Sequence, residues 1–211
     1  MSQNIIKHVR TDKQISGSAL DGSTKSLFLE LRDERTQSVS ISKLDLESMR
    51  LDKKETKLEW WSKLVGAKEN CLFCVAYLDQ KDPTNHVFFT IELSSNQKKK
   101  LDQLPELEVM GAVPEIYEHG SEYYKTVAEF LALDLPLSCE YMEWNDKIII
   151  SYYLRSGNGF ARYLLLIKGG EKQWKIVQDE QMKGFSPGSF FVFEDKLIFI
   201  KDGNEVCVYT D

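Results

Sequence analysis

Short apolar runs alternate with polar, turn-forming clusters along the whole chain, and this pattern predicts many β-strands joined by hairpins. The clearest pair is 147–154 with 161–167. The intervening residues include Gly157, Asn158 and Gly159, which readily adopt the positive φ that a tight reversal needs. Three further pairs have the same form: 27–31 with 39–41, 71–78 with 86–93, and 196–200 with 205–209.

One of these segments recurs in residue identity as well as in pattern. Residues 141–150 align with 190–199 at an offset of 49, and Asp-Lys precedes the apolar run in both. Weaker matches occur twice earlier in the chain. The predicted equivalent points are Leu27, Leu72, Ile148 and Leu197, with spacings of 45, 76 and 49 residues.

A period of about 40 to 50 residues is typical of β-propeller blades, in which each four-stranded sheet stacks on its neighbours. We therefore expect an all-β fold of antiparallel hairpin repeats. It would be a small or irregular propeller-like structure of four to five blades, in a single domain of residues 1–211. A β-sandwich or a barrel is the alternative. The N-terminal stretch 4–9 is expected to complete the last sheet beside 206–209, which would close the ring.

The spacing of 76 residues interrupts this rhythm. It predicts an insertion between Asp102 and Leu137, or a degenerate blade. Part of this region has helical spacing after Ser121, a predicted N-cap, and a strand fits the same residues about as well. The helical set is Tyr123, Val127, Phe130 and Leu131, and the strand set is Tyr124, Thr126, Ala128 and Phe130.

The faces of the predicted strands also favour stacked sheets. Residues 71–78 are apolar at both alternating sets of positions, so this strand is expected to be covered on both faces. Residues 27–32 instead alternate Leu with Phe28, Glu30 and Arg32, which predicts a strand with one face in water. Inner and outer strands of a blade would differ in this way.

The units that end in 174–177 and in 206–209 resemble an uncharacterised bacterial family with β-propeller-like repeats. The resemblance is one of pattern and extends over most of the chain. It implies a propeller-like fold and brings no catalytic residues with it. The Trp-Asp dipeptide of one well-known propeller class does not occur in the sequence.

Composition and charge narrow the classes of partner. Hydrophobic residues make up 42% of the chain and charged residues 28%, as in ordinary globular proteins. The net charge of -6 repels phosphate backbones and anionic headgroups, which disfavours nucleic acid and membranes. The basic run 98–100 is expected on a turn or an edge strand. With no signal-length apolar stretch and only four cysteines, the chain is expected to be cytoplasmic.

No local motif predicts an enzyme, a cofactor or a metal site. Cys71 and Cys74 have the C-x-x-C spacing, but positions i and i+3 of a strand point to opposite faces, so both are expected in the core. The acidic clusters at 33–34, 79–82 and 202–204 are expected to form turns. The three histidines, which do not stand at metal-ligand spacing, are His8, His86 and His119.

Paired aromatic residues carry the one functional indication. Neighbours in a strand point to opposite faces, so each pair predicts one ring in the core and one at the surface, where Tyr and Trp are enriched at binding sites. The alternative is that these rings only fill the core. We expect a non-enzymatic module that binds a protein or a small molecule. The competing hypothesis is a hydrolase or lyase with a site assembled from several blades. The candidate binding residues are Trp60, Trp61, Tyr123, Tyr124, Tyr152 and Tyr153.

Overall fold

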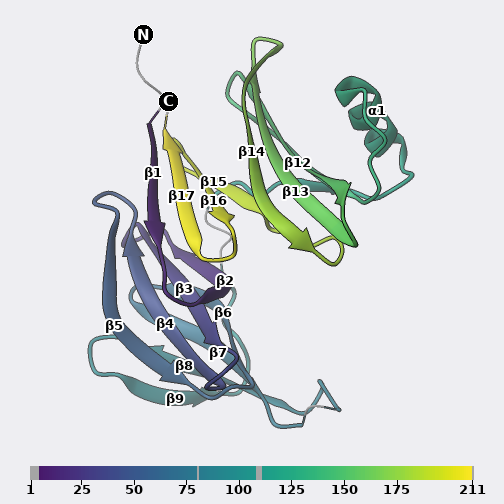
Figure 1. The fold of residues 1–211 in the computed structure, drawn as a ribbon. Helices are drawn as coiled ribbons and strands as arrows, with labels where there is room; N and C mark the ends of the chain where they lie inside the picture. Colours follow the sequence, from purple (N-terminus) through teal and green to yellow (C-terminus); the bar gives the residue numbers. More distant parts are fainter. Residues whose placement is uncertain (1–4, 80, 108–110, 211) are drawn as a thin grey trace. The chain divides into compact units, whose positions relative to one another are not determined.

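The computed structural model describes residues 5–79, 81–107 and 111–210, which form four antiparallel sheets and one helix (Figure 1). The expected all-β class and the repeated antiparallel hairpins are confirmed. The chain divides into two compact units, Lys7–Met110 and Met1–Ile6 with Gly111–Asp211. The expectation of a single closed ring stays a prediction.

The unit Lys7–Met110 contains two four-stranded sheets, each built from strands that follow one another in the chain. Two of the predicted hairpins are found here as β3–β4 and β7–β8. The first sheet consists of β2 (Gln14–Asp21), β3 (Ser26–Asp33), β4 (Ser38–Asp45) and β5 (Arg50–Leu58). The second consists of β6 (Ser62–Lys68), β7 (Cys71–Tyr77), β8 (His86–Glu92) and β9 (Gln97–Leu101).

The other unit contains the remaining two sheets, except that residues 7–10 of β1 (Ile5–Arg10) belong to the unit Lys7–Met110. One has the order β10-β11-β12-β13-β14, and the other has the order β1-β17-β16-β15. The N-terminal strand β1 thus lies beside β17, as predicted for residues 4–9, of which Asn4 lies outside the described residues. The strands are β10 (Glu115–Tyr117), β11 (Cys139–Trp144), β12 (Lys147–Ser156), β13 (Gly159–Lys168), β14 (Glu171–Met182), β15 (Phe190–Phe193), β16 (Lys196–Lys201), β17 (Glu205–Thr210) and β1 (Ile5–Arg10).

The aligned segments 141–150 and 190–199 occupy matching places in their sheets. Each is a hairpin with a two-residue turn, and the first turn residue, Asn145 or Glu194, has a positive φ of 55° or 53°. The four predicted equivalent points are each the second residue of a strand: Leu27 of β3, Leu72 of β7, Ile148 of β12 and Leu197 of β16.

The long spacing between the second and third of these points is explained by an insertion that contains β10 and α1 (Glu122–Leu131). The Ser121 hydroxyl accepts a hydrogen bond from the Tyr124 backbone N–H at 3.3 Å, which confirms the N-cap and excludes the strand alternative. The buried face is Tyr124 with Val127. Tyr123 and Phe130 of the predicted helical set are instead 68% and 57% exposed.

Within each unit the two sheets share a hydrophobic core. In Lys7–Met110 this core explains a wrong prediction. The face of β3 that carries Phe28 and Glu30 was expected in water, but these residues are 0% and 1% exposed. Phe28 packs between the sheets. The strand β7 is fully covered on one face only: Leu72, Cys74 and Ala76 are buried, whereas the other face is half-buried at Cys71 and Phe73 and exposed at Tyr77, so the predicted cover on both faces is confirmed in part. The shared core consists of Ala19, Phe28 and Ile41 from the first sheet with Leu64, Leu72, Cys74, Ala76, Phe89 and Ile91 from the second.

A buried glutamate also joins the two sheets of each unit by hydrogen bonds. Glu30 on β3 accepts the Leu64 N–H of β6 at 2.6 Å. Glu140 on β11 accepts the N–H groups of Gly188 and Ser189, just before β15, at 2.6 and 3.3 Å. Burial raises the pKa of Glu140 above its usual value, although these hydrogen bonds act in the opposite direction. A buried carboxylate is tolerated here because backbone donors of the next sheet satisfy it.

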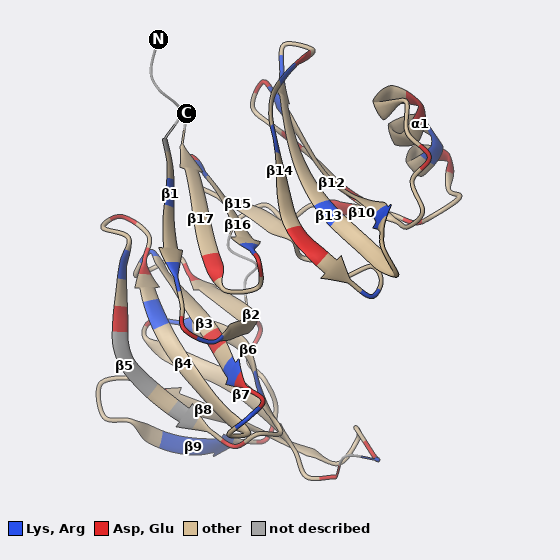
Figure 2. Ribbon diagram, viewed as in Figure 1, with Lys and Arg blue, Asp and Glu red and all other residues tan. Residues whose placement is uncertain are grey.

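The basic run 98–100 lies on β9, at the edge of its sheet, where Figure 2 shows a continuous band of basic residues. Its three lysines are exposed, and the Lys98 ammonium lies 3.9 Å from the centroid of the Phe89 ring. Lysines on an edge strand discourage pairing with another chain, so this position agrees with the expected edge placement.

Candidate functional site

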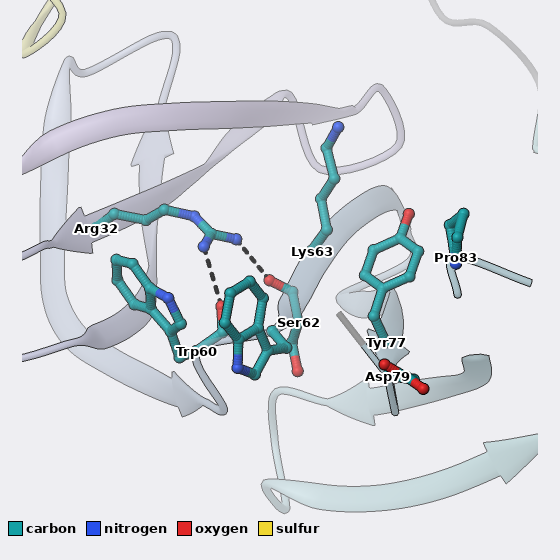
Figure 3. Close-up of a pocket in the computed structure, with 8 residues that line it drawn as sticks. Arg32, Trp60, Ser62, Lys63, Tyr77, Asp79 and Pro83 are labelled. Carbon is teal, nitrogen blue, oxygen red and sulfur yellow. Dashed lines mark hydrogen bonds between the residues drawn. The ribbon is translucent and has the colours of Figure 1, made fainter. Parts of the chain in front are cut away.

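The pair Trp60-Trp61 lines an open cavity of about 310 Å³ in the unit Lys7–Met110 (Figure 3). The cavity lies where β3 and β7 end and where β6 begins. In an antiparallel meander these positions fall at the same end of their sheets, so residues far apart in sequence come together. The lining residues are Arg32, Trp60, Trp61, Ser62, Lys63, Tyr77, Asp79 and Pro83.

Both tryptophans belong to the short turn that leads from the first sheet to the second, and not to a strand. The Ser62 N–H donates to the Glu59 carbonyl at 2.9 Å and closes this turn. The Trp61 carbonyl accepts the Tyr77 N–H at 3.1 Å, which ties the turn to β7. Trp61 is 46% exposed and Trp60 is half-buried, so neither residue is fully buried in the core.

Arg32 fixes the backbone that carries the two indoles. Its Nη1 donates to the Trp60 carbonyl at 3.0 Å and its Nη2 to the Ser62 carbonyl at 2.7 Å, as the dashed lines in Figure 3 show. Its guanidinium carbon also lies 5.1 Å from the centroid of a Trp60 ring, within cation–π range. Its Nε donates to Glu30 at 2.8 Å. All three nitrogens are therefore engaged, and Arg32 positions the turn.

The surface of the cavity combines aromatic rings with two exposed charges of opposite sign. Tyr77 is 36% exposed and lines the cavity with Trp61. Lys63 and Asp79 are exposed and line it as well. This arrangement suits a flat apolar or aromatic group, with Lys63 and Asp79 available to polar atoms at the edge of that group.

The candidates Tyr123 and Tyr124 lie in the other unit, on α1. They follow the predicted pattern of one exposed and one buried ring, since Tyr124 is 6% exposed. Tyr123 stacks on Tyr117 with ring centroids 5.3 Å apart, and Tyr117 stacks on Tyr141 at 5.4 Å. The buried Tyr124 hydroxyl donates to the Leu135 carbonyl, which fits a structural role.

The candidates Tyr152 and Tyr153 are both buried, at 2% and 0% exposure, so the prediction that one of them reaches the surface is wrong. The physical reason is that β12 is an inner strand with cover on both faces. Tyr152 stacks on Tyr163 at 5.5 Å. The Tyr153 hydroxyl hydrogen-bonds with the backbone of Ser186 at 3.1 Å, and burial raises its pKa.

Sequence reasoning found the two tryptophans and missed the other residues of the cavity. The sequence pattern places Arg32 on a solvent-exposed strand face and Tyr77 in an apolar strand, and it predicts neither as part of a binding site. The hairpin pairing could have indicated these residues, because it places the end of β3, the end of β7 and the start of β6 at one end of two neighbouring sheets. What pairing does not show is which side chains meet there.

The remaining candidate chemistry has structural explanations. Cys74 is buried, and burial raises its pKa to about 12, so its thiol is held in the neutral form. The four cysteines are all free, and Cys71 is half-buried rather than in the core as expected. Across the described ranges, no three His, Cys, Asp or Glu side chains are grouped so that they could hold a metal ion. Over the same ranges no helix is long and apolar enough to cross a membrane.

No family model matches the chain, and no curated protein matches it. Among solved structures, the acylaminoacyl peptidase of Pyrococcus horikoshii is 11% identical, with a TM-score of 0.32 over 90% of the chain. The WD40 domain of SCAP from fission yeast is also 11% identical, with a TM-score of 0.25 over 99% of the chain. The chain spans 28% and 42% of the lengths of these two chains. Similarity at this level indicates no activity, substrate or partner.

Proposed function

We propose that the protein is a non-catalytic binding module, and that its partner inserts an apolar or aromatic group between Trp61 and Tyr77. The observation that supports this is the pair of partly exposed indoles, carried by a turn whose backbone Arg32 holds, in an open cavity of about 310 Å³. Hydrogen bonds from Arg32 hold the Trp60 and Ser62 carbonyls before any partner arrives.

A fixed site favours binding because less conformational entropy is lost when the partner docks. Exposed Trp and Tyr are also the side chains that most often dominate binding energy at interfaces, since each buries a large area with few rotatable bonds. The cavity is at the small end of the range for ligand pockets, about 300 to 1,000 Å³. This size suits one aromatic or proline side chain of a protein partner, or a single-ring small molecule.

The alternative of a hydrolase or lyase requires carboxylates that are free to reach a substrate. The buried Glu30 and Glu140 instead accept backbone hydrogen bonds. Among the described residues, Asp79 is the one carboxylate that lines the cavity, and its Oδ1 accepts the Lys81 N–H at 2.8 Å. These contacts favour binding over catalysis at this site. A cytoplasmic location and membership of the resembled bacterial family are part of the same proposal, the former supported by the four free cysteines.

The test is a peptide phage display on the full chain, with no selection step that uses the Trp61→Ala variant. Affinities of the selected peptides are then measured by calorimetry. We expect Trp61→Ala to weaken binding by about thirtyfold or more, because truncation of a hot-spot residue typically costs at least ~2 kcal/mol.

The matched control is Tyr123→Ala, which removes an aromatic ring that is 68% exposed but does not line the cavity. This variant should leave the affinity unchanged. Thermal unfolding of both variants verifies that each is folded. If every selected peptide binds the Trp61→Ala variant as well as the parent protein, the cavity is not the binding site.

A further inference from the structure

A second cavity of about 310 Å³ lies in the unit that contains Gly111–Asp211, where α1 ceases to cover the face of β12, β13 and β14. Figure 1 shows α1 beside the β12–β13 hairpin. The floor of the cavity is apolar, because Tyr152, Leu165 and Ile167 line it and are at most 5% exposed. The exposed lining residues include Phe130 and the two lysines Lys172 and Lys175.

A β-bulge brings the two lysines to the same face. In a regular strand, residues three apart point to opposite faces. Here Lys172 pairs with Ile167 and Lys175 pairs with Leu165, and the register shifts between these pairs. Since Ile167 and Leu165 are two residues apart and share a face, Lys172 and Lys175 share it too.

In the part of the chain that the structure describes, neither lysine is paired with a carboxylate. The Lys175 ammonium lies 4.1 Å from the Tyr163 ring centroid and 5.4 Å from that of Tyr152. Ring faces orient a cation but leave its charge and its N–H donors available to an anion. Among the residues that the structure describes, no carboxylate forms an ion pair with Lys172 or Lys175. The protein as a whole has a net charge of -6, so this pair of ammonium groups beside an apolar floor is a local exception.

The geometry points to a binding site for a small amphiphilic carboxylate, with its apolar body on Tyr152, Leu165 and Ile167 and its carboxylate between the ammonium groups of Lys172 and Lys175. An ammonium–carboxylate hydrogen bond is charge-assisted and stronger than a neutral one. The apolar floor contributes by excluding water from the body of the ligand. This site is separate from the cavity lined by Trp60 and Trp61, the tryptophan cavity, so each of the two proposals is tested by its own experiment.

The test uses three probes with the same eight-carbon chain: octanoate, 1-octanol and octylammonium. Each is titrated into the full chain by calorimetry. We expect octanoate to bind about tenfold or more tightly than 1-octanol, because only octanoate gains the charge-assisted contacts. Octylammonium should bind most weakly, because like charges repel. No octanoate binding, or equal binding of octanoate and octanol, would overturn the proposal.

Variants then measure separately what the lysine charges and the apolar floor contribute to octanoate binding. The double variant Lys172→Gln with Lys175→Gln should lower the octanoate affinity to that of octanol, whereas Lys125→Gln, an exposed lysine of α1 outside the lining, should not change it. Leu133→Trp fills the cavity and should reduce the binding of octanoate and octanol alike. An unchanged octanoate affinity in the lysine double variant contradicts the site. Should the double variant unfold, each single lysine variant carries the same test, with a threefold or greater loss expected.

Discussion

Glu30 is predicted to control both the stability of the unit Lys7–Met110 and the shape of the tryptophan cavity. Its carboxylate is 1% exposed and accepts three hydrogen bonds: from the Leu64 N–H at 2.6 Å, the Ser16 hydroxyl at 2.6 Å and Arg32 Nε at 2.8 Å. Two variants separate the contributions. Glu30→Ala removes all acceptors, and Glu30→Gln keeps the shape and one carbonyl oxygen.

The expected magnitude follows from the groups that each variant leaves without a partner. In Glu30→Ala the buried Leu64 N–H loses its acceptor, which costs about 1–3 kcal/mol. Arg32 also loses its charged partner, and breaking a buried ion pair typically costs about 3–5 kcal/mol. The Arg32 side chain is 23% exposed, so water compensates for part of this loss. We therefore expect about 3–4 kcal/mol for Glu30→Ala, and about 1–2 kcal/mol for Glu30→Gln.

The assay is urea unfolding followed by circular dichroism, with Glu34→Gln as the control. Glu34 is an exposed glutamate in the turn after β3, and its substitution should change the free energy of unfolding by less than about 0.5 kcal/mol. A second readout is the affinity for a peptide selected on the tryptophan cavity. It should fall in Glu30→Gln, because Arg32 then holds the Trp60 and Ser62 carbonyls less firmly.

The reasoning would be refuted if Glu30→Ala destabilised the protein no more than Glu34→Gln does. The carboxylate would then not join the two sheets in solution. A loss of stability with no change in peptide affinity would show that Glu30 stabilises the core but does not shape the binding site.

Three further predictions concern single side chains. Burial raises the pKa of Asp21, but hydrogen bonds, led by one from the Asn70 N–H, outweigh it and lower the pKa below 3.8. Its contribution to stability is therefore complete above about pH 3.8 and is lost as the pH falls through the lower folded pKa. Asp21→Asn should flatten the acid limb of a pH–stability curve, and an unchanged limb would contradict this. In the folded protein at pH 8, iodoacetamide should modify half-buried Cys71 before Cys74, whose pKa burial raises to about 12. Peptide mapping that finds Cys74 modified first would exclude this order. Ser121→Ala should cost about 1 kcal/mol in thermal unfolding through loss of the N-cap, and Thr at the same position should restore most of it.

The local pattern of the sequence was sufficient for the four predicted hairpins and for the N-cap at Ser121, but it left helix and strand open for the residues that follow the cap. The hairpin 147–167 and the N-cap at Ser121 depend on residues close in the chain, and such short-range preferences are visible without tertiary contacts. The repeat of 141–150 at 190–199 also appeared in the sequence, because equivalent sheet positions impose the same alternation and the same turn.

Burial and faces were decided only in three dimensions. Alternation along β3 indicates which residues share a face, but it does not show that the next sheet supplies the Leu64 N–H that allows Glu30 to be buried. The same limit applies to Tyr152 and Tyr153, both covered because β12 is an inner strand.

The residues that line both cavities are also brought together only by the tertiary structure. Arg32 reaches the carbonyls of Trp60 and Ser62 only because β6, the first strand of the second sheet, lies against β2 and β3 of the first. Lys172 and Lys175 share a face only because β14 bulges against β13, which changes the two-residue period on which sequence reasoning relies. Strand identity is a local property of the chain. The side chains that meet at a site are set by register and by the neighbouring sheet.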